Sequence, residues 1–230
     1  MNVSTTLQRL NERIYEACRR SGRKTEDIRL MAVTKFHNAE LVREAFDAGL
    51  RLFGENRVQE AEGKFPSFLE THSEAELHLI GSLQRNKTKR ALSLFKCIQS
   101  LDRIELVDEL VTLAGNREVP LDIFFELHTG EESKAGFPDL DTLYPAVEKV
   151  LSCGGLNICG LMTMAPFTTD QNPIRASFRT LSAAQTRLKQ RFPEADWSCL
   201  SMGMSNDFEI AVEEGSTLLR IGTALFGGRT

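Results

Sequence analysis

The chain has 230 residues, of which 41% are hydrophobic and 26% are charged, and its formal net charge is −4. This is the composition of an ordinary globular protein, and the negative charge argues against a general nucleic-acid binder, which needs a basic face. No apolar run is long enough to cross a membrane, and the five scattered cysteines lack the spacing of a zinc site. The polar N-terminal segment does not resemble a secretory leader, so we expect a cytoplasmic protein with reduced cysteines.

The first third of the chain alternates segments of helical periodicity with short apolar runs. Residues 3–20 carry apolar side chains at helical spacing, and Ser4 is placed to cap this helix. The apolar run Leu30–Val33 predicts a buried parallel strand. The elements that follow are a helix over 38–48 that ends at Gly49, a strand over 51–54 and a helix over 57–68.

The same strand–helix unit continues to the end of the chain. The predicted strands cover residues 77–80, 97–98 with their flanks, 121–127, 156–162, 198–200 and 217–221. The predicted helices cover residues 86–93, 102–114 with Asp102 as the cap, 139–151, 173–191 and 206–214, and a short segment over 222–227 follows the last strand.

Eight strand–helix alternations with short connections predict an α/β fold, a single (βα)8 TIM-type parallel barrel with an extra N-terminal helix. No change of composition marks a linker, so residues 1–230 form one predicted domain. The N-terminal helix would complete the outer ring, since no long helix follows the eighth strand. One miscounted strand would leave an open, doubly wound sheet as the alternative.

Lys35 stands just after the first predicted strand, where a charged residue at the end of an apolar run needs an explanation. Ligands of parallel α/β folds bind at the carboxyl ends of the strands. A lysine held there against apolar walls loses its proton more readily and becomes a nucleophile towards carbonyl groups. A lysine whose stem merely covers the strand edge is the alternative, and position alone does not decide between them.

The loops after the last two predicted strands have features of an anion site. In barrels of this kind, a phosphate site is often built from these loops and the start of a short helix. Ser205 precedes a predicted helix whose Asn206 and Glu209 have capping-box spacing, and Gly222 with Thr223 would let backbone N–H groups approach an anion closely. An ordinary helix cap at Ser205 and an ordinary turn at Gly222 are the alternative.

A nucleophilic lysine facing a phosphate site indicates a ligand with both an aldehyde and a phosphate, and pyridoxal 5'-phosphate has both. Arg220 lies two residues before Gly222, so both face the barrel interior, where the guanidinium would meet the pyridine nitrogen of that cofactor. Asn56 after the second strand and Met162 at the end of the sixth belong to the same rim of strand ends.

At these residues the chain resembles a known family. The matching motifs run in order along almost the whole chain: Met31–Lys35, Phe53–Asn56, His78–Lys87, Glu132–Gly136, Gly160–Pro166, Leu200–Ser205 and Arg220–Gly227. They resemble those of the pyridoxal phosphate homeostasis protein family, single-domain relatives of the alanine racemase N-terminal barrel. Two segments depart from the usual pattern, Phe36–His37 and Leu127–His128, and the second would alter contacts with the cofactor ring.

The resemblance implies a barrel that holds pyridoxal 5'-phosphate as an internal aldimine on Lys35. It implies that Ser205, Gly222 and Thr223 hold the phosphate, that Arg220 faces the ring nitrogen and that Asn56 lines the pocket. Met162 completes the predicted cofactor-binding set. The family is associated with vitamin B6 homeostasis, without an established reaction.

Two features predict a non-catalytic carrier or regulator of this cofactor, with no catalytic residue. Racemisation needs a second acid or base on the opposite face of the substrate, and in the related alanine racemases a tyrosine from a second domain and partner subunit has that role. Here Tyr15 and Tyr144 lie in predicted helices away from the strand ends. Arg220 would keep the ring nitrogen unprotonated and weaken the ring as an electron sink. A weak amino-acid racemase, or an aldolase that attacks phosphorylated sugars through Lys35, are the alternatives.

Lys87 and Lys134 lie in loops on the predicted cofactor side. They are either solvated lysines or secondary acceptors that take the cofactor from Lys35. Secondary acceptors would suit delivery to apo forms of pyridoxal-phosphate enzymes through transient contacts. We expect a monomer with no metal, no nucleic acid and no membrane among its partners.

Overall fold

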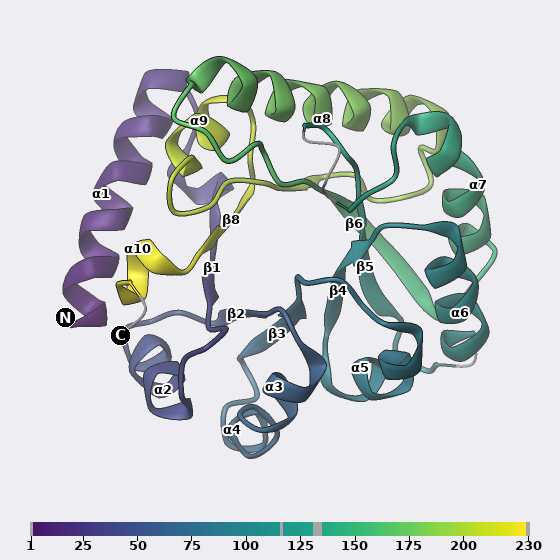
Figure 1. Ribbon diagram of the computed structural model, residues 1–230, viewed down its shortest axis with the longest axis horizontal. Helices are drawn as coiled ribbons and strands as arrows, with labels where there is room; N and C mark the ends of the chain where they lie inside the picture. The colour runs from purple at the N-terminus through teal and green to yellow at the C-terminus, as the bar shows by residue number, and fades with distance from the viewer. Residues whose placement is uncertain (1, 116, 131–134, 229–230) are drawn as a thin grey trace.

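Eight parallel strands form a closed barrel in the computed structural model, which describes residues 2–115, 117–130 and 135–228 (Figure 1). The strands follow one another around the barrel in chain order, and β8 pairs with β1 to close it. Their bounds are β1 Arg29–Val33, β2 Leu52–Glu55, β3 Glu76–Leu79, β4 Cys97–Leu101, β5 Leu121–Glu126, β6 Leu156–Met162, β7 Cys199–Ser201 and β8 Leu218–Ile221. The predicted TIM-type barrel is therefore confirmed, and the open sheet is excluded.

The helices surround the barrel as an outer ring (Figure 1). They are α1 Val3–Ser21, α2 Ala39–Asp47, α3 Val58–Glu62, α4 Pro66–Thr71, α5 Thr88–Leu94, α6 Ile104–Ala114, α7 Leu140–Leu151, α8 Gln171–Arg191, α9 Phe208–Glu213 and α10 Thr223–Phe226, with 3-10 turns at Thr25–Asp27 and Arg85–Lys87. The extra helix α1 packs on α9 and α10, as predicted for a helix that completes the ring. Among the described residues, no helix is both long and apolar enough to cross a membrane.

The interior of the barrel is filled by side chains, so that a ligand can enter only at one of its ends. One cluster of inward-facing residues occupies the interior: Met31, Leu52, Cys97, Phe124, Met162 and Leu218. A much larger apolar core lies between the strands and the helices. This filling leaves the two ends of the barrel for a site, and in this architecture ligands bind at the carboxyl ends of the strands.

A chain of buried polar groups also crosses the interior, where Arg220 pairs in register with Met31 and Ser201 with Met162. Gln99 Nε2 lies 2.9 Å from His78 Nδ1, and Ser201 Oγ donates to Gln99 Oε1 at 2.7 Å. Arg220 Nη1 in turn donates to Ser201 Oγ at 2.8 Å. Because each buried polar group has a partner, the chain ties β3, β4, β7 and β8 together and holds Arg220 in one place.

Close packing of β6 against β7 depends on a glycine. Gly160 has φ 149°, at a point where the register between β5 and β6 shifts. A Cβ atom there would lie 1.9 Å from the carbonyl oxygen of Cys199. No side chain fits at this position, which explains the glycine in the middle of a strand.

Two predicted helix caps are wrong, and one predicted helix is divided. Asn2 caps α1 by accepting from the Ser4 N–H, so Ser4 supplies the donor and is not the cap. Asp102 does not cap α6, because its carboxylate accepts from the Arg103 guanidinium instead. The predicted helix over 57–68 is two helices, α3 and α4, since Pro66 lacks the N–H that a continuous helix would need.

Candidate functional site

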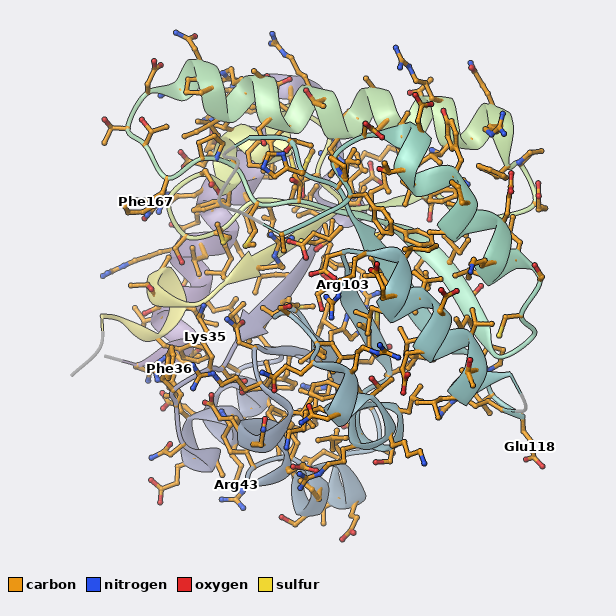
Figure 2. All side chains as sticks on the ribbon, turned by 45° about the vertical axis from the view of Figure 1, so that its right-hand side comes forward. Lys35, Phe36, Arg43, Arg103, Glu118 and Phe167 are labelled. Atoms are coloured by element: carbon orange, nitrogen blue, oxygen red, sulfur yellow. The ribbon has the colours of Figure 1, made fainter. Side chains whose placement is uncertain are left out.

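A cavity of about 420 Å³ opens at the carboxyl ends of the strands. Its volume is within the range of small-molecule and cofactor sites. Six of the seven predicted cofactor-binding residues line it: Lys35, Asn56, Ser205, Arg220, Gly222 and Thr223. Figure 2 places Lys35 at the end of β1 and Phe167 on the loop after β6, both at this end of the barrel.

Met162 is the exception among the predicted residues. It is buried in the interior cluster one layer below the cavity, and Met164 lines the cavity in its place. Inward-facing positions recur every second residue of a strand, so residues 162 and 164 share a direction but lie at different depths.

Lys35 reaches the cavity from a tight turn that follows β1. The inward-facing positions of this segment are Met31 in the interior, then Val33 and Lys35 on the cavity wall. The turn is closed by the His37 N–H, which donates to the carbonyl oxygen of Thr34 at 3.1 Å. Phe36 has φ 67°, and among the described residues it alone has a positive φ without being a glycine. A positive φ at the third position is typical of type II turns, which usually place glycine there.

Arg220 forms the floor of the cavity with a fixed guanidinium. The side chain is buried, and Nη1 donates to the carbonyl oxygen of Ser201 at 2.6 Å while Nη2 donates to that of Thr163 at 2.8 Å. Burial lowers the pKa of Arg220 to about 10, although the nearby Glu126 and Asp207 act in the opposite direction. The guanidinium therefore remains charged at neutral pH and cannot rotate without losing these bonds.

The residues of the predicted anion site lie together at the start of α10. Ser205 Oγ accepts from the Ala224 N–H at 3.0 Å, which brings the loop after β7 against Gly222 and Thr223. A hydroxyl that accepts one hydrogen bond retains a proton to donate, so Ser205 can still bond to an anion. At Gly222 a Cβ atom would lie 3.4 Å from the Val33 carbonyl oxygen, which is an ordinary contact, so packing against β1 does not require the glycine.

The predicted capping box at Asn206 and Glu209 is not formed. Helix α9 begins later, at Phe208, with Asp207 as its N-terminal flanking residue. The Asp207 carboxylate accepts from the Met204 N–H at 2.5 Å, and Glu209 pairs with Arg13 of α1 at 2.9 Å. The loop after β7 is thus fixed by Asp207, which leaves Ser205 to contact α10.

Glu126 at the end of β5 lines the cavity, and our sequence analysis did not name it. The side chain is only 3% exposed, and burial together with the negative charge of Asp102 raises its pKa to about 7, while Arg220 acts to lower it. The feature of the sequence that could have identified it is a charged residue near the end of the predicted strand over 121–127.

Glu126→Gln is expected to stabilise the protein more at pH 8 than at pH 5. The carboxyl pKa is higher in the folded chain than its ordinary 4.5, so the stability of the wild type falls as pH rises from 4.5 through about 7. Glutamine does not ionise and therefore avoids this loss, which is at most about 3.5 kcal/mol at 1.4 kcal/mol per pKa unit. Urea unfolding of both proteins at both pH values measures the effect. An equal difference at the two pH values would contradict it.

Lys87 lies in a neighbouring hollow of about 640 Å³ that shares Asn56, Gly81 and Ser82 with the cavity wall. It is half-buried there, beside Arg57. The second predicted acceptor, Lys134, lies outside the described residues.

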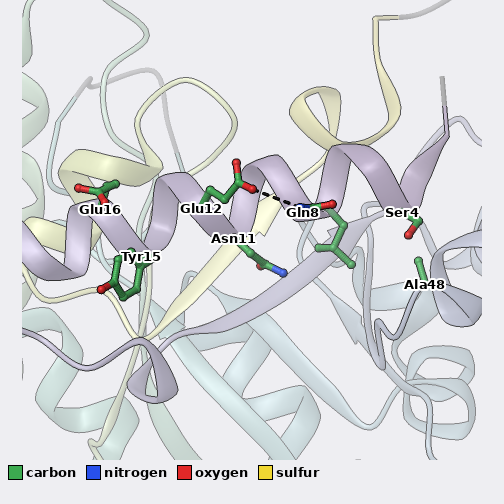
Figure 3. A pocket seen from close by; sticks show the side chains of 8 residues that line it. Ser4, Gln8, Asn11, Glu12, Tyr15, Glu16 and Ala48 are labelled. Atoms are coloured by element: carbon green, nitrogen blue, oxygen red, sulfur yellow. Dashed lines mark hydrogen bonds between the residues drawn. The ribbon is translucent and has the colours of Figure 1, made fainter.

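The two tyrosines lie far from the cavity. Tyr15 lines a hollow of about 550 Å³ on the outer face of α1, where Gln8 donates to Glu12 (Figure 3). Tyr144 of α7 packs against the Phe192 ring, with the Arg191 guanidinium 4.4 Å from its ring centre. Neither hydroxyl is near the lining of the Lys35 cavity.

Comparison with known proteins gives matches over the whole chain. The family described as alanine racemase, N-terminal domain, matches residues 6–230. The pyridoxal phosphate homeostasis protein of Aquifex aeolicus (strain VF5) is 38% identical over 229 residues, which cover 100% of this chain and 99% of that protein.

Solved structures agree with the barrel fold. The structure of PipY of Synechococcus elongatus PCC7942 with PLP bound has a TM-score of 0.85 and 34% identity, and the match covers 98% of this chain and 100% of that one. Alanine racemase from Bacillus anthracis is similar in fold alone, with a TM-score of 0.71 at 15% identity, and the match covers 97% of this chain but 56% of that one.

Proposed function

The chain belongs to the pyridoxal phosphate homeostasis protein family, within the wider family of the alanine racemase N-terminal domain, and we propose that it binds pyridoxal 5'-phosphate in the cavity at the carboxyl end of the barrel. One observation carries this proposal: Lys35 lines the same 420 Å³ cavity as Ser205, Gly222 and Thr223. An amine and an anion site at one cavity suit a ligand with both an aldehyde and a phosphate. The PLP-bound PipY structure supports the assignment.

Each end of the cofactor has residues to hold it. Lys35 would form a Schiff base with the aldehyde, and Ser205 with the backbone at Gly222 and Thr223 would bind the phosphate. Arg220 lines the same cavity, and its guanidinium would face the ring nitrogen. When bound, the cofactor supplies an electrophilic aldehyde that condenses with amines.

We propose further that the protein holds and delivers the cofactor without turnover, as a monomer in the cytoplasm. The cationic Arg220 would leave the ring nitrogen unprotonated and the ring a poor electron sink. Neither Tyr15 nor Tyr144 reaches the cavity to act as a second acid or base. The homeostasis name of the relatives supports a regulatory role, and transient contact with apo enzymes would complete the delivery.

Spectral titration tests the proposal. Purified protein titrated with pyridoxal 5'-phosphate should develop visible absorbance from the Schiff base, and transfer to an apo enzyme should discharge it. Protein that stays colourless overturns the assignment and favours the aldolase alternative. Exchange of an amino-acid α-proton with deuterated solvent would support the racemase alternative and contradict a role without turnover.

Ser205→Ala is expected to weaken binding of pyridoxal 5'-phosphate by roughly tenfold or more, because a hydrogen bond to a charged group contributes about 1.5–3 kcal/mol. Binding of pyridoxal, which lacks the phosphate, should not change. Ser82→Ala is the matched control, since Ser82 also lines the cavity but lies away from α10. An equal loss of affinity for pyridoxal would exclude a phosphate contact at Ser205.

A further inference from the structure

A cluster of three charged residues, Lys64, Glu55 and Glu60, lies beneath the turn that carries Lys35. The Lys64 side chain is only 10% exposed, and Glu55 is fully buried. Lys64 Nζ donates to Glu55 Oε1 at 2.6 Å and to Glu60 Oε1 at 2.9 Å. The two carboxylates fix the ammonium, which has one proton left for the nearby backbone carbonyl oxygens to share.

The cluster bonds to the backbone on both sides of Lys35. Lys64 Nζ donates to the carbonyl oxygens of Thr34 at 2.9 Å and His37 at 3.1 Å, which are the first and last residues of the turn. The N–H of Phe36 donates to the Glu60 carboxylate. Thr34 Oγ1 donates to Glu55 Oε1 at 2.6 Å. The three neighbours of Lys35 in the turn are thus all held by the cluster.

This arrangement is costly if it serves stability alone. Buried ion pairs contribute little net stability, because removing charges from water offsets their attraction. Burial raises the pKa of Glu55, and its second oxygen, Oε2, is buried without a hydrogen-bond partner among the described residues. The cluster also maintains Phe36 at φ 67°, which costs of order 1 kcal/mol or more for a residue with a side chain.

We propose that Lys64 is the positioning residue for Lys35, acting through the turn and not by contact with the cofactor. The proposal rests on the proposed function. A ligand whose phosphate is fixed at Ser205 and Thr223 presents its aldehyde carbon at one place, so the Lys35 amine must be presented there as well. The amine nitrogen attacks that carbon, a C=N bond replaces the C=O bond, and the oxygen leaves as water. A displaced amine slows this step, since small misplacements reduce rates steeply.

Lys64→Met tests the proposal by separating bond formation from binding. We expect the visible absorbance to form roughly tenfold to a hundredfold more slowly than in the wild type. Affinity for pyridoxine 5'-phosphate, which carries an alcohol in place of the aldehyde, should be unchanged because it needs no Schiff base. Lys96→Met is the control, since Lys96 also pairs with a glutamate, Glu76, but at the opposite end of β3 and β4.

Glu60 variants keep the test decisive if Lys64→Met does not fold. Glu60→Gln retains an acceptor for the Phe36 N–H and for Lys64, and it should react nearly as fast as the wild type. Glu60→Ala removes the acceptor and should slow the reaction. Unchanged rates in Lys64→Met and Glu60→Ala overturn the proposal, and so does a parallel loss of pyridoxine 5'-phosphate affinity. A wild type that never absorbs in the visible range instead defeats the proposed function itself.

Discussion

Lys35→Ala is expected to abolish the visible absorbance that develops with pyridoxal 5'-phosphate. The Schiff base needs an amine at the end of β1, and alanine supplies none. Affinity for pyridoxine 5'-phosphate should fall little, because Ser205, Gly222 and Thr223 still line the anion site. Absorbance spectra of both proteins under the same titration measure the effect. Among the predictions made here for the cofactor site, this is the only one in which the signal disappears completely.

The matched control is Lys87→Ala. Lys87 is a half-buried lysine in the adjoining hollow, so a non-selective reaction of lysines with the aldehyde would affect both variants alike. Borohydride reduction followed by peptide mapping should place the label on Lys35 in the wild type. Label that first appears on Lys35 and later on Lys87 during transfer to an apo enzyme would support Lys87 as a secondary acceptor. Normal absorbance in Lys35→Ala would show that another residue carries the cofactor.

The barrel could be predicted because its signals are local. Each strand is a short apolar run such as Leu30–Val33, and each run is followed by a segment of helical periodicity. The errors concern the ends of helices. Asn2, Ser4 and Asp102 are all residue types that cap helices, and the choice among them depends on competing partners such as the Arg103 guanidinium. Those partners are fixed by the fold, and a local pattern does not reveal them.

The sequence was enough to predict that most of the site residues lie close together, because the carboxyl ends of parallel strands meet at one end of a barrel. This rule places Lys35, Arg220 and Gly222 on one cavity without any knowledge of distances. It does not give depth, and so Met162 was assigned to the cavity although it lies one layer below. Depth depends on the stagger of neighbouring strands, which is altered near Gly160 by the irregular register between β5 and β6.

The contacts that support the site could not be predicted from the sequence. Lys64 lies within the helix predicted over 57–68 and looks like an ordinary surface lysine. Its burial beneath the turn after β1 follows from the way α3 packs on β2. Glu126 was overlooked for a related reason. A single carboxylate in a strand can be recognised as part of a site only when its partner is known. Here the partner is Arg220, which lies ninety-four residues later in the chain and is brought near Glu126 by the closure of the barrel.

Arg220→Leu is expected to cause the largest loss of stability, about 3 kcal/mol of unfolding free energy. The Thr163 carbonyl oxygen loses its charged donor, and leaving a buried polar group without a partner costs about 1–3 kcal/mol. The Ser201 carbonyl oxygen also loses a charged donor but keeps the Thr163 N–H at 3.2 Å. Urea denaturation at neutral pH measures this. Arg13→Leu is the matched control, because Arg13 is half-exposed and pairs with Glu209 at the surface, where an ion pair contributes less than about 1 kcal/mol.

Arg220→Lys separates the charge of this residue from its geometry. A lysine retains the positive charge but has no planar fork that can bond to Thr163 and Ser201 together, so its stability should lie between those of the wild type and Arg220→Leu. If Arg220→Lys is as stable as the wild type, charge alone matters at this position. If Arg220→Leu loses no more stability than Arg13→Leu, the hydrogen bonds of Arg220 do not stabilise the protein. If stability falls in the order wild type, Arg220→Lys, Arg220→Leu, the three hydrogen bonds from the guanidinium to Ser201 and Thr163 stabilise the protein. The same bonds would then hold the guanidinium rigid beneath the proposed cofactor. The proposed contact of Arg220 with the ring nitrogen could then not be exchanged for an acidic partner without loosening the barrel.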